Sequence, residues 1–206
     1  MSGQYKTDYV HLLKEDEATH LKPRIGIISD AEILRLYATD SEQALEVLYL
    51  RDSALLNAVC HRYISNDSDA EDVLQDSFLK IFGNIGKYKP QKEGSLRSWM
   101  TRIVANNAID LLRKQRKLKE MPVDDYQNLP DEAPDLDGIP IDVFHKMIRQ
   151  LPDVYRAVLN LHVFEKKTHK EIAKILGIKE NTSYSHFHRA KNLLADKIKR
   201  YKQLQR

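Results

Sequence analysis

Cysteine, glycine and proline are all scarce in this chain of 206 residues. It contains one cysteine, seven glycines and seven prolines. A single cysteine excludes an intramolecular disulfide and is typical of a reducing compartment. Few glycines and prolines leave few places for tight turns, which favours helices over a strand-rich fold. The one cysteine, Cys60, lies in the apolar stretch LLNAVCHRY, so we predict a small core residue rather than a nucleophile.

Long hydrophobic runs are also missing. No apolar stretch is long enough to cross a bilayer, and the N-terminus lacks the apolar core of a signal peptide, so we expect a cytoplasmic protein. The sequence shows no nucleophile–base pair and no phosphate-binding loop, so we predict neither an enzyme nor a cofactor. Four histidines near the C-terminus lack the spacing and the cysteine or carboxylate support of a closed metal site. They are His162, His169, His186 and His188, and we predict no metal.

Charge is abundant, and its distribution is more informative than the net value of +3. Lys and Arg number 8 against 15 Asp and Glu in residues 1–86, and 10 against 2 in residues 87–119. Residues 120–142 hold 8 acids and no base, whereas residues 143–206 hold 15 bases and 5 acids. One basic run is commonly only a solvated face. Two runs on helical patterns, flanking an acidic segment, predict two contacts with a polyanion.

Apolar residues recur at three- and four-residue intervals from Ser29 onward, which is typical of amphipathic helices. Ser29 begins a capping-box pattern, and we also expect N-terminal caps at Ser41 and Ser68. A further helix is predicted to begin at Ser95 or Ser98. Because no alternating strand pattern and no internal repeat occurs, the predicted fold class is all-α.

The segment 119–140 divides the chain. It holds four prolines, one glycine and seven acids, with few large apolar residues, which indicates an acidic flexible linker. We therefore predict two helical domains, at residues 29–118 and 141–206. Residues 1–28 form an N-terminal extension to which no structure is assigned.

The C-terminal domain carries a helix-turn-helix pattern. Helices are expected at 141–151, 152–164, 169–176 and 180–200. Gly177 provides the left-handed residue that the turn between the last two helices requires.

The last of these helices has an apolar face and a polar face. Ser183, Phe187, Ala190 and Leu194 recur at helical spacing and predict a packing stripe. Six polar residues on the other face and its flank can donate to phosphates and base edges in a major groove. They are Asn181, Tyr184, Ser185, His188, Arg189 and Lys191. A helical hairpin that packs on a protein partner also fits the glycine turn, but the basic charge of the domain favours DNA.

The stretch GSLRSWMTRIVANNAIDLLRKQRK, residues 94–117, is the second basic block. We predict Trp99 as a core anchor. Two adjacent asparagines in mid-helix weaken the helix, and bases of a melted strand can be held by amide, guanidinium and aromatic groups. The predicted single-strand surface comprises Lys87, Tyr88, Lys89, Arg102, Asn106 and Arg113. For Asn106, a hydrogen bond to a neighbouring loop is an open alternative.

The stretch DAEDVLQDSFLKIF, residues 69–82, is acidic in its first turns, where a helix favours acids. No histidine accompanies these acids, so we predict a solvated or partner-facing surface rather than an active site.

Taken together, these stretches resemble the extracytoplasmic-function (ECF) sigma factors of bacterial RNA polymerase. Residues 69–82 are similar to region 2.1–2.2 of that family, and residues 94–117 to regions 2.3–2.4. The stretch LPDVYRAVLNLHVFEKKTHKEIAKILGIKENTSYSHFHRAK is similar to region 4. The resemblance implies a region 2-like helical bundle and a region 4-like helix-turn-helix, together covering residues 29–118 and 141–198.

The resemblance also implies partners: core RNA polymerase, through its β′ clamp helices and β flap, promoter DNA, and an anti-sigma factor. Asp72, Gln75 and Asp76 match the helix that docks on the β′ subunit. Arg102, Asn106 and the loop before Trp99 match the surface that captures the melted minus-ten strand. Residues 180–191 match the helix that enters the major groove at the minus-thirty-five element.

Some residues depart from the family pattern. Leu96 stands where the family often has Phe, and Ser183, Tyr184 and His186 replace its common valine, lysine and arginine. The promoter sequence therefore does not carry over. An alternative function is a helix-turn-helix regulator that acts without core polymerase, but it leaves residues 69–117 unexplained.

Overall fold

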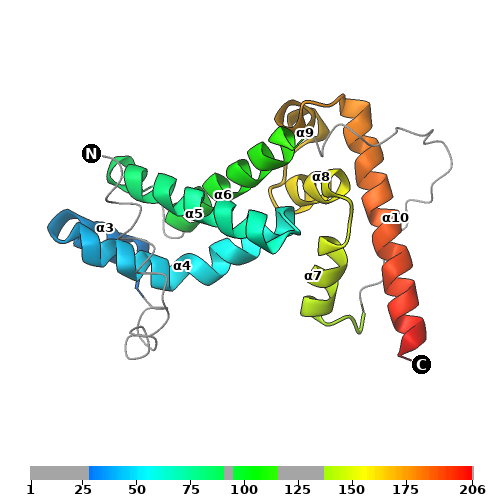
Figure 1. The fold of residues 1–206 in the computed structure, drawn as a ribbon, viewed down its shortest axis with the longest axis horizontal. Helices are drawn as coiled ribbons and strands as arrows, with labels where there is room; N and C mark the ends of the chain where they lie inside the picture. The colour runs from blue at the N-terminus through cyan, green and yellow to red at the C-terminus, as the bar shows by residue number, and fades with distance from the viewer. Residues whose placement is uncertain (1–27, 91–94, 116–136, 206) are drawn as a thin grey trace. The chain divides into compact units, whose positions relative to one another are not determined.

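The computed structural model describes residues 28–90, 95–115 and 137–205, and every regular element within these ranges is a helix (Figure 1). The prediction of an all-α fold is therefore confirmed. The N-terminal extension up to residue 27 and most of the acidic linker lie outside the described residues. Among the helices that are described, none combines the length and the apolar character that a membrane span needs.

The chain divides into two compact units. The first combines residues up to Asn57 with Phe78–Ile103, and the second combines Ala58–Ser77 with the chain from Val104 onward. Three helices contribute to both units: α4 (Ser41–Tyr63), α5 (Asp67–Asn84) and α6 (Ser95–Lys114).

The first unit also contains α3 (Asp30–Thr39) and the short 3-10 helix η2 (Ile85–Lys87). The capping box predicted at Ser29 is present, since its side chain accepts the backbone N–H of Glu32 and the glutamate side chain returns to the backbone of Ser29. Apolar side chains from each helix form the core of this unit. They include Ile33, Leu48, Leu56, Ile81, Ile85, Leu96 and Met100.

The caps predicted at Ser41 and Ser68 are wrong by one and two residues. The side chain of Asp40 accepts the backbone N–H three residues further along, at 3.0 Å, and that of Asn66 does the same at 2.9 Å. Aspartate and asparagine are at least as good as serine at this position. Each serine therefore lies inside the first turn of its helix, α4 or α5.

A buried ion network ties α3, α4 and the start of α6 together. The Arg51 guanidinium contacts Asp30 at 3.0 Å and Asp52 at 2.7 Å, and all three side chains are at most 4% exposed. Asp52 also accepts a hydrogen bond from Nε of Arg97 at 2.7 Å, and Asp30 accepts the backbone N–H of Leu96 at 3.0 Å. The start of α6 is therefore fixed by charge-assisted hydrogen bonds as well as by apolar packing.

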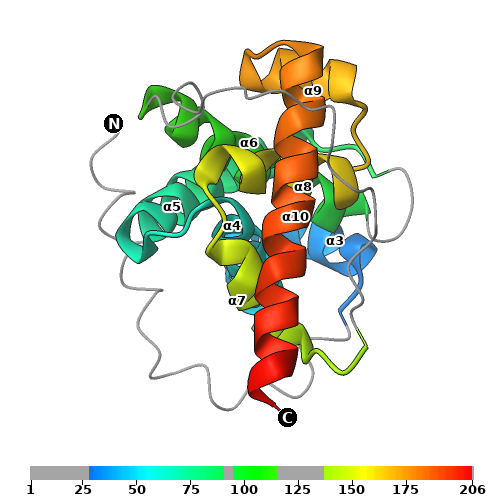
Figure 2. The same ribbon diagram turned by 90° about the vertical axis from the view of Figure 1, so that its right-hand side faces the viewer.

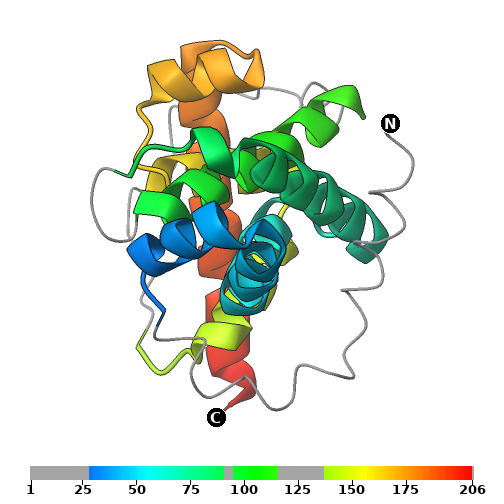
Figure 3. The same ribbon diagram turned by 90° about the vertical axis from the view of Figure 1, so that its left-hand side faces the viewer.

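The second unit is built around α8 (Asp153–Val163), in which every residue from Val154 to Leu161 is buried. It also contains α7 (Ile141–Arg149), α9 (His169–Leu176) and α10 (Glu180–Leu204). The long helix α10 packs on α7, α8 and α9 (Figure 2). Viewed from the opposite side, α9 crosses the N-terminal end of α10 (Figure 3). The predicted helices of the C-terminal domain are confirmed, with ends shifted by up to four residues.

Candidate nucleic-acid interfaces

The turn between α9 and α10 has the geometry of a helix-turn-helix. Thr168 caps α9 in a capping box with Glu171. Gly177 follows the helix at φ 68° and ψ 36°, the left-handed conformation that the sequence predicted. Its N–H and that of Ile178 both reach the carbonyl of Ala173. The Ala173 carbonyl near the end of α9 is thus hydrogen-bonded, and the chain turns at once into α10.

A buried hydrogen bond fixes α10 against α9. The Ser183 hydroxyl lies 2.8 Å from Nδ1 of His169, and both side chains are buried. The His169 ring is also stacked on His162 at 4.6 Å and contacts Tyr184 at 3.9 Å between ring centroids. Burial, followed by the nearby charges of His162 and His188, lowers the pKa of His169 to about 4. The histidine is therefore neutral at neutral pH, as its packing position requires.

The predicted polar face of α10 is only partly exposed. Asn181 is exposed and Tyr184 is 47% exposed, at the N-terminal end of the helix. Ser185 is fully buried, and its hydroxyl donates to the Asn181 carbonyl at 3.2 Å. The prediction that Ser185 faces the groove is therefore wrong. Helix α10 packs on α8 as well as on α9, and the His186 ring contacts the Tyr155 ring. The buried face of α10 is therefore wider than the single packing stripe that the sequence predicted.

The remaining residues predicted on this face, His188, Arg189 and Lys191, are half-buried and interact with neighbouring side chains. His188 is half-buried, and Nη1 of Arg189 donates to the Tyr155 hydroxyl at 3.1 Å. The Lys191 ammonium lies 5.2 Å from the centroid of the Phe187 ring. Their stems are thus held along α10 by packing, while the N-terminal end of the helix carries the more exposed side chains.

Three exposed lysines surround the turn: Lys170 and Lys174 on α9, and Lys179 just before α10. We did not predict them as contacts, because the sequence places them off the polar face of α10. The basic charge of residues 143–206 was the signal that could have identified them.

On α6, Arg102, Asn106 and Arg113 are all exposed. Intervals of four and seven residues place them on one side of the helix. Arg113 pairs with Asp110 on the same surface at 3.2 Å. The exposure that a strand-binding role requires is therefore present at each position.

The adjacent asparagine has a different environment. Nδ2 of Asn107 donates to the buried Ser77 hydroxyl at 2.8 Å, which links α6 to α5. The structural hydrogen bond that was an alternative for Asn106 thus exists at Asn107. Of the two amides, the exposed Asn106 is the one available at the surface of α6.

A hollow of about 350 Å³ opens beside Trp99 in the first unit. Its lining combines two aromatic rings, two lysines, an asparagine and an isoleucine: Lys80, Asn84, Lys87, Tyr88, Trp99 and Ile103. The rings of Tyr88 and Trp99 lie 5.2 Å apart between centroids, and the Tyr88 hydroxyl bonds Ser95. Trp99 is half-buried, so its prediction as a core anchor is wrong. Lys87 and Lys89 are exposed beside Tyr88.

The acidic surface of α5 is exposed as well. Asp72, Gln75 and Asp76 are exposed on one face, and Leu79, one turn further on, is 38% exposed. An acidic face with an apolar residue suits a protein partner that is basic at its rim.

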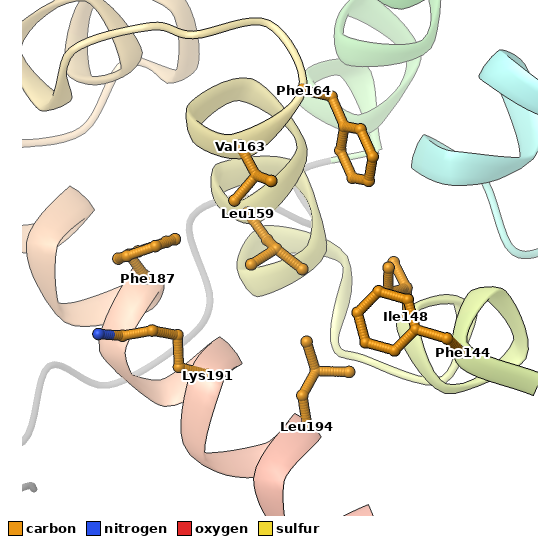
Figure 4. Close-up of a pocket in the computed structure, with 8 residues that line it drawn as sticks. All are labelled: Phe144, Ile148, Leu159, Val163, Phe164, Phe187, Lys191 and Leu194. Carbon is orange, nitrogen blue, oxygen red and sulfur yellow. The ribbon is translucent and has the colours of Figure 1, made fainter. Parts of the chain in front are cut away.

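An apolar groove of about 180 Å³ lies between α7, α8 and α10 (Figure 4). Seven apolar side chains and one lysine line it: Phe144, Ile148, Leu159, Val163, Phe164, Phe187, Leu194 and Lys191. Val163 and Phe164 are each 39% exposed at its edge. Within the described residues, no group of three or more His, Cys, Asp or Glu side chains is arranged to hold a metal ion.

Two family models match this arrangement, in order along the chain. Residues 48–118 match sigma-70 region 2, and residues 141–194 match sigma-70 region 4. These matches define an all-α protein of the sigma-70 class, with the helix-turn-helix in its second region.

The sequences of two relatives agree with this class. The chain is 28% identical over 153 residues to the ECF RNA polymerase sigma factor SigE of Mycolicibacterium smegmatis, covering 69% of this chain and 57% of that protein. It is 30% identical over 136 residues to the RNA polymerase sigma factor SigV of Bacillus subtilis, covering 64% and 77%. The solved structure of CnrH in complex with the cytosolic domain of CnrY aligns with 82% of this chain and 97% of that one, at 19% identity and a TM-score of 0.45. The chain belongs to the ECF sigma factor family.

Proposed function

We propose that this chain binds core RNA polymerase in the cytoplasm and directs it to specific promoters. The observation that carries the proposal is the aromatic and cationic hollow beside Trp99 on the same chain as a helix-turn-helix. A regulator that binds only duplex DNA has no use for such a hollow, whereas an initiation factor must hold a melted strand. The role is that of an initiation factor, not of an enzyme.

Strand capture is assigned to the hollow and to α6. A base that leaves the duplex can stack on Tyr88 or Trp99, which contributes about 1–3 kcal/mol per base in comparable proteins. Lys80 and Lys87 at the rim, with Lys89 beside it, neutralise phosphates. Arg102 and Asn106, followed by Arg113, extend the surface along α6 and bind the minus-ten strand.

Duplex recognition is assigned to the N-terminal end of α10. Asn181, Tyr184 and His188 supply base contacts at the minus-thirty-five element. Five basic side chains supply phosphate contacts, which position the helix without specifying sequence. They are Lys170, Lys174, Lys179, Arg189 and Lys191.

Core polymerase is assigned to two further surfaces. The exposed face of α5, with Asp72, Gln75 and Asp76, binds the β′ clamp helices. The apolar groove between α7, α8 and α10 receives the β flap, because its exposed rim residues Val163 and Phe164 would be covered there. An anti-sigma factor would act by competing for these surfaces.

The domains follow from this assignment. Residues 29–118 hold the minus-ten and core surfaces, and residues 141–206 hold the minus-thirty-five surface. The acidic segment 119–140 serves as the tether between them, and its charge keeps it from DNA.

Transcription with purified components tests the proposal. On a promoter selected from random DNA, core polymerase with this chain should give a defined transcript, and either component alone should give none. Specific operator binding by the isolated chain, with no effect of core polymerase, would instead support the helix-turn-helix regulator.

A further inference from the structure

Tyr184 is the exposed end of an aromatic cluster that joins α8, α9 and α10. Its ring lies 3.9 Å from the His169 ring between centroids, and the His169 ring is stacked on His162 at 4.6 Å. The Phe187 ring meets both imidazoles edge-on, at 4.6 Å from His162 and 5.6 Å from His169. Tyr184 is 47% exposed, whereas His169 is only 7% exposed. The tyrosine therefore has a packed part and a part that a ligand can reach.

The His169 ring is held in one orientation. Its Nδ1 lies 2.8 Å from the buried Ser183 hydroxyl, and the same ring contacts Tyr184, the next residue of α10. His169 is also the first residue of α9, whose start is fixed by the capping box between Thr168 and Glu171. Because the backbone, a hydrogen bond and ring stacking all restrain the imidazole, it can support a neighbouring side chain.

This support restricts Tyr184 before any ligand binds. An exposed side chain normally loses rotamer freedom when it binds, and that loss weakens the complex. Tyrosine has only two side-chain dihedral angles, so one close ring contact removes much of its freedom. Tyr184 is therefore preorganised, which favours contacts that depend on direction, such as hydrogen bonds.

The surroundings of Tyr184 favour a base edge as its ligand. It lies at the N-terminal end of α10, close to the exposed Asn181. Exposed lysines around the turn, Lys174 and Lys179, supply the charge that phosphates attract. The tyrosine hydroxyl is uncharged and both donates and accepts a hydrogen bond. Since each base pair presents a different pattern of donors and acceptors in the major groove, such a group can distinguish one base pair from another.

We propose that His169 is a positioning residue for base recognition: it holds Tyr184 in the orientation in which the tyrosine hydroxyl bonds the edge of one base in the minus-thirty-five element. His169 itself touches no base. The inference rests on the proposed function, and it assigns the preference at that base pair to two residues on two helices rather than to α10 alone.

Transcription from a panel of promoters locates the base pair. Core polymerase with the full chain is assayed on promoters that carry each possible base pair at every position of the minus-thirty-five element. Tyr184→Phe removes only the hydroxyl, and it should reduce discrimination between base pairs at least about fivefold at one position. A uniform decrease at all positions would indicate a phosphate contact, and no decrease would indicate no contact. Either result would overturn the proposal.

Changes at His169 should act at the same base pair. His169→Leu removes the ring contact and should lower discrimination there about as much as Tyr184→Phe, with little change at other positions. Added to Tyr184→Phe, it should cause no further loss, because the two residues act as a unit. His169→Phe keeps an aromatic ring beside Tyr184 and should retain most of the discrimination. Equal losses at every position in His169→Leu, or no rescue by His169→Phe, would make His169 a packing residue only.

A milder pair of variants covers the case in which circular dichroism shows that His169→Leu does not fold. Ser183→Ala removes only the hydrogen bond to His169 and should lower discrimination at the base pair identified with Tyr184→Phe. Ser185→Ala is the matched control, because this buried serine bonds the Asn181 carbonyl of its own helix. It should leave base preference unchanged. A loss as large in the control, or no loss in Ser183→Ala, would contradict the positioning.

Nuclear magnetic resonance of the free full chain separates this inference from the proposed function. Nuclear Overhauser effects between the ring protons of Tyr184 and His169 should be present, and they should weaken in Ser183→Ala. Their absence would overturn the positioning, whatever the chain does with polymerase. Failure of the unchanged chain to direct any transcript, with these effects present, would overturn the proposed function instead.

Discussion

At the scale of single residues, burial separates side chains that maintain the fold from side chains that can bind. Asp52 and Asp72 are both acids on helices, yet Asp52 is 0% exposed and bonds two arginines, whereas Asp72 faces solvent. Their sequence contexts do not distinguish them. The consequences of substitution should therefore differ strongly between such pairs.

Asp52→Asn should destabilise the fold, because it leaves the buried Arg51 with one fewer anionic partner and weakens the contact with Arg97. Breaking a buried ion pair typically costs about 3–5 kcal/mol. Chemical denaturation should show this loss in the free energy of unfolding. Asp110→Asn, in the exposed pair with Arg113, should change the free energy by under ~1 kcal/mol. Equal effects at both positions would contradict the role of the network.

The two adjacent asparagines of α6 should separate function from stability. Asn106→Ala should slow promoter opening while leaving closed-complex binding and stability nearly unchanged, because its amide is at the surface. Asn107→Ala should lower the free energy of unfolding by about 0.5–1.5 kcal/mol, because the buried Ser77 hydroxyl loses the hydrogen bond that it accepts and keeps only the one that it donates to the Val73 carbonyl. Permanganate footprinting of the melted strand and thermal unfolding measure the two effects. If Asn106→Ala impairs both promoter steps equally, Asn106 has no special role in strand capture.

Two buried histidines should make the fold sensitive to mild acid. Burial lowers the pKa of His169 and of His186 to about 4, below the usual 6.5. Between these values the unfolded chain binds protons that the folded chain does not. The free energy of unfolding should therefore be at its full value above pH 6.5 and fall as the pH approaches 4. Calorimetry from pH 7 to pH 5 should show a smaller decrease in Tm for His169→Gln than for the unchanged chain, whereas exposed His145→Gln should leave the decrease unaltered.

At the scale of helices, the local sequence predicted which helices exist better than it predicted where each helix ends or which face of it is buried. The box at Ser29 and the left-handed Gly177 depend on neighbours within four residues, and both are confirmed. The cap assigned to Ser68 was wrong because Asn66, two residues earlier, already caps the helix by accepting the N–H of Asp69, which leaves Ser68 inside the first turn. Ser185 was placed on the wrong face because α8 also covers α10, and no local pattern shows how many neighbours a helix has.

The exposed face of α5 carries the prediction for core binding. Asp76→Arg should weaken binding of core polymerase at least tenfold, since it replaces an anion with a cation on a surface expected to meet basic residues. The fold should be unaffected, because the side chain is exposed. Pull-down of core polymerase, with circular dichroism as a check on folding, measures this. Glu42→Arg, an exposed acid on α4, is the matched control, and unchanged capture by Asp76→Arg would remove α5 from the interface.

At the scale of the whole molecule, the order of motifs predicted the family, but not the long-range contacts. Arg156 and Tyr63 are 93 residues apart, and nothing in the periodicity of either helix links them. Trp99 was misplaced for a related reason: the Tyr88 ring beside it comes from the preceding loop, which the helix pattern does not include. Contacts that close long loops therefore required the structure, whereas helices, the turn and their order did not.

The proposed function requires above all that this chain confers promoter specificity on core polymerase. The most direct measurement is run-off transcription on a promoter selected from random DNA, with purified core polymerase in the presence and absence of the chain. A single transcript start that requires both components, and that Asn106→Ala and Asp76→Arg each reduce, is the predicted result. Equal transcription with and without the chain, at any ratio to core polymerase, would contradict it.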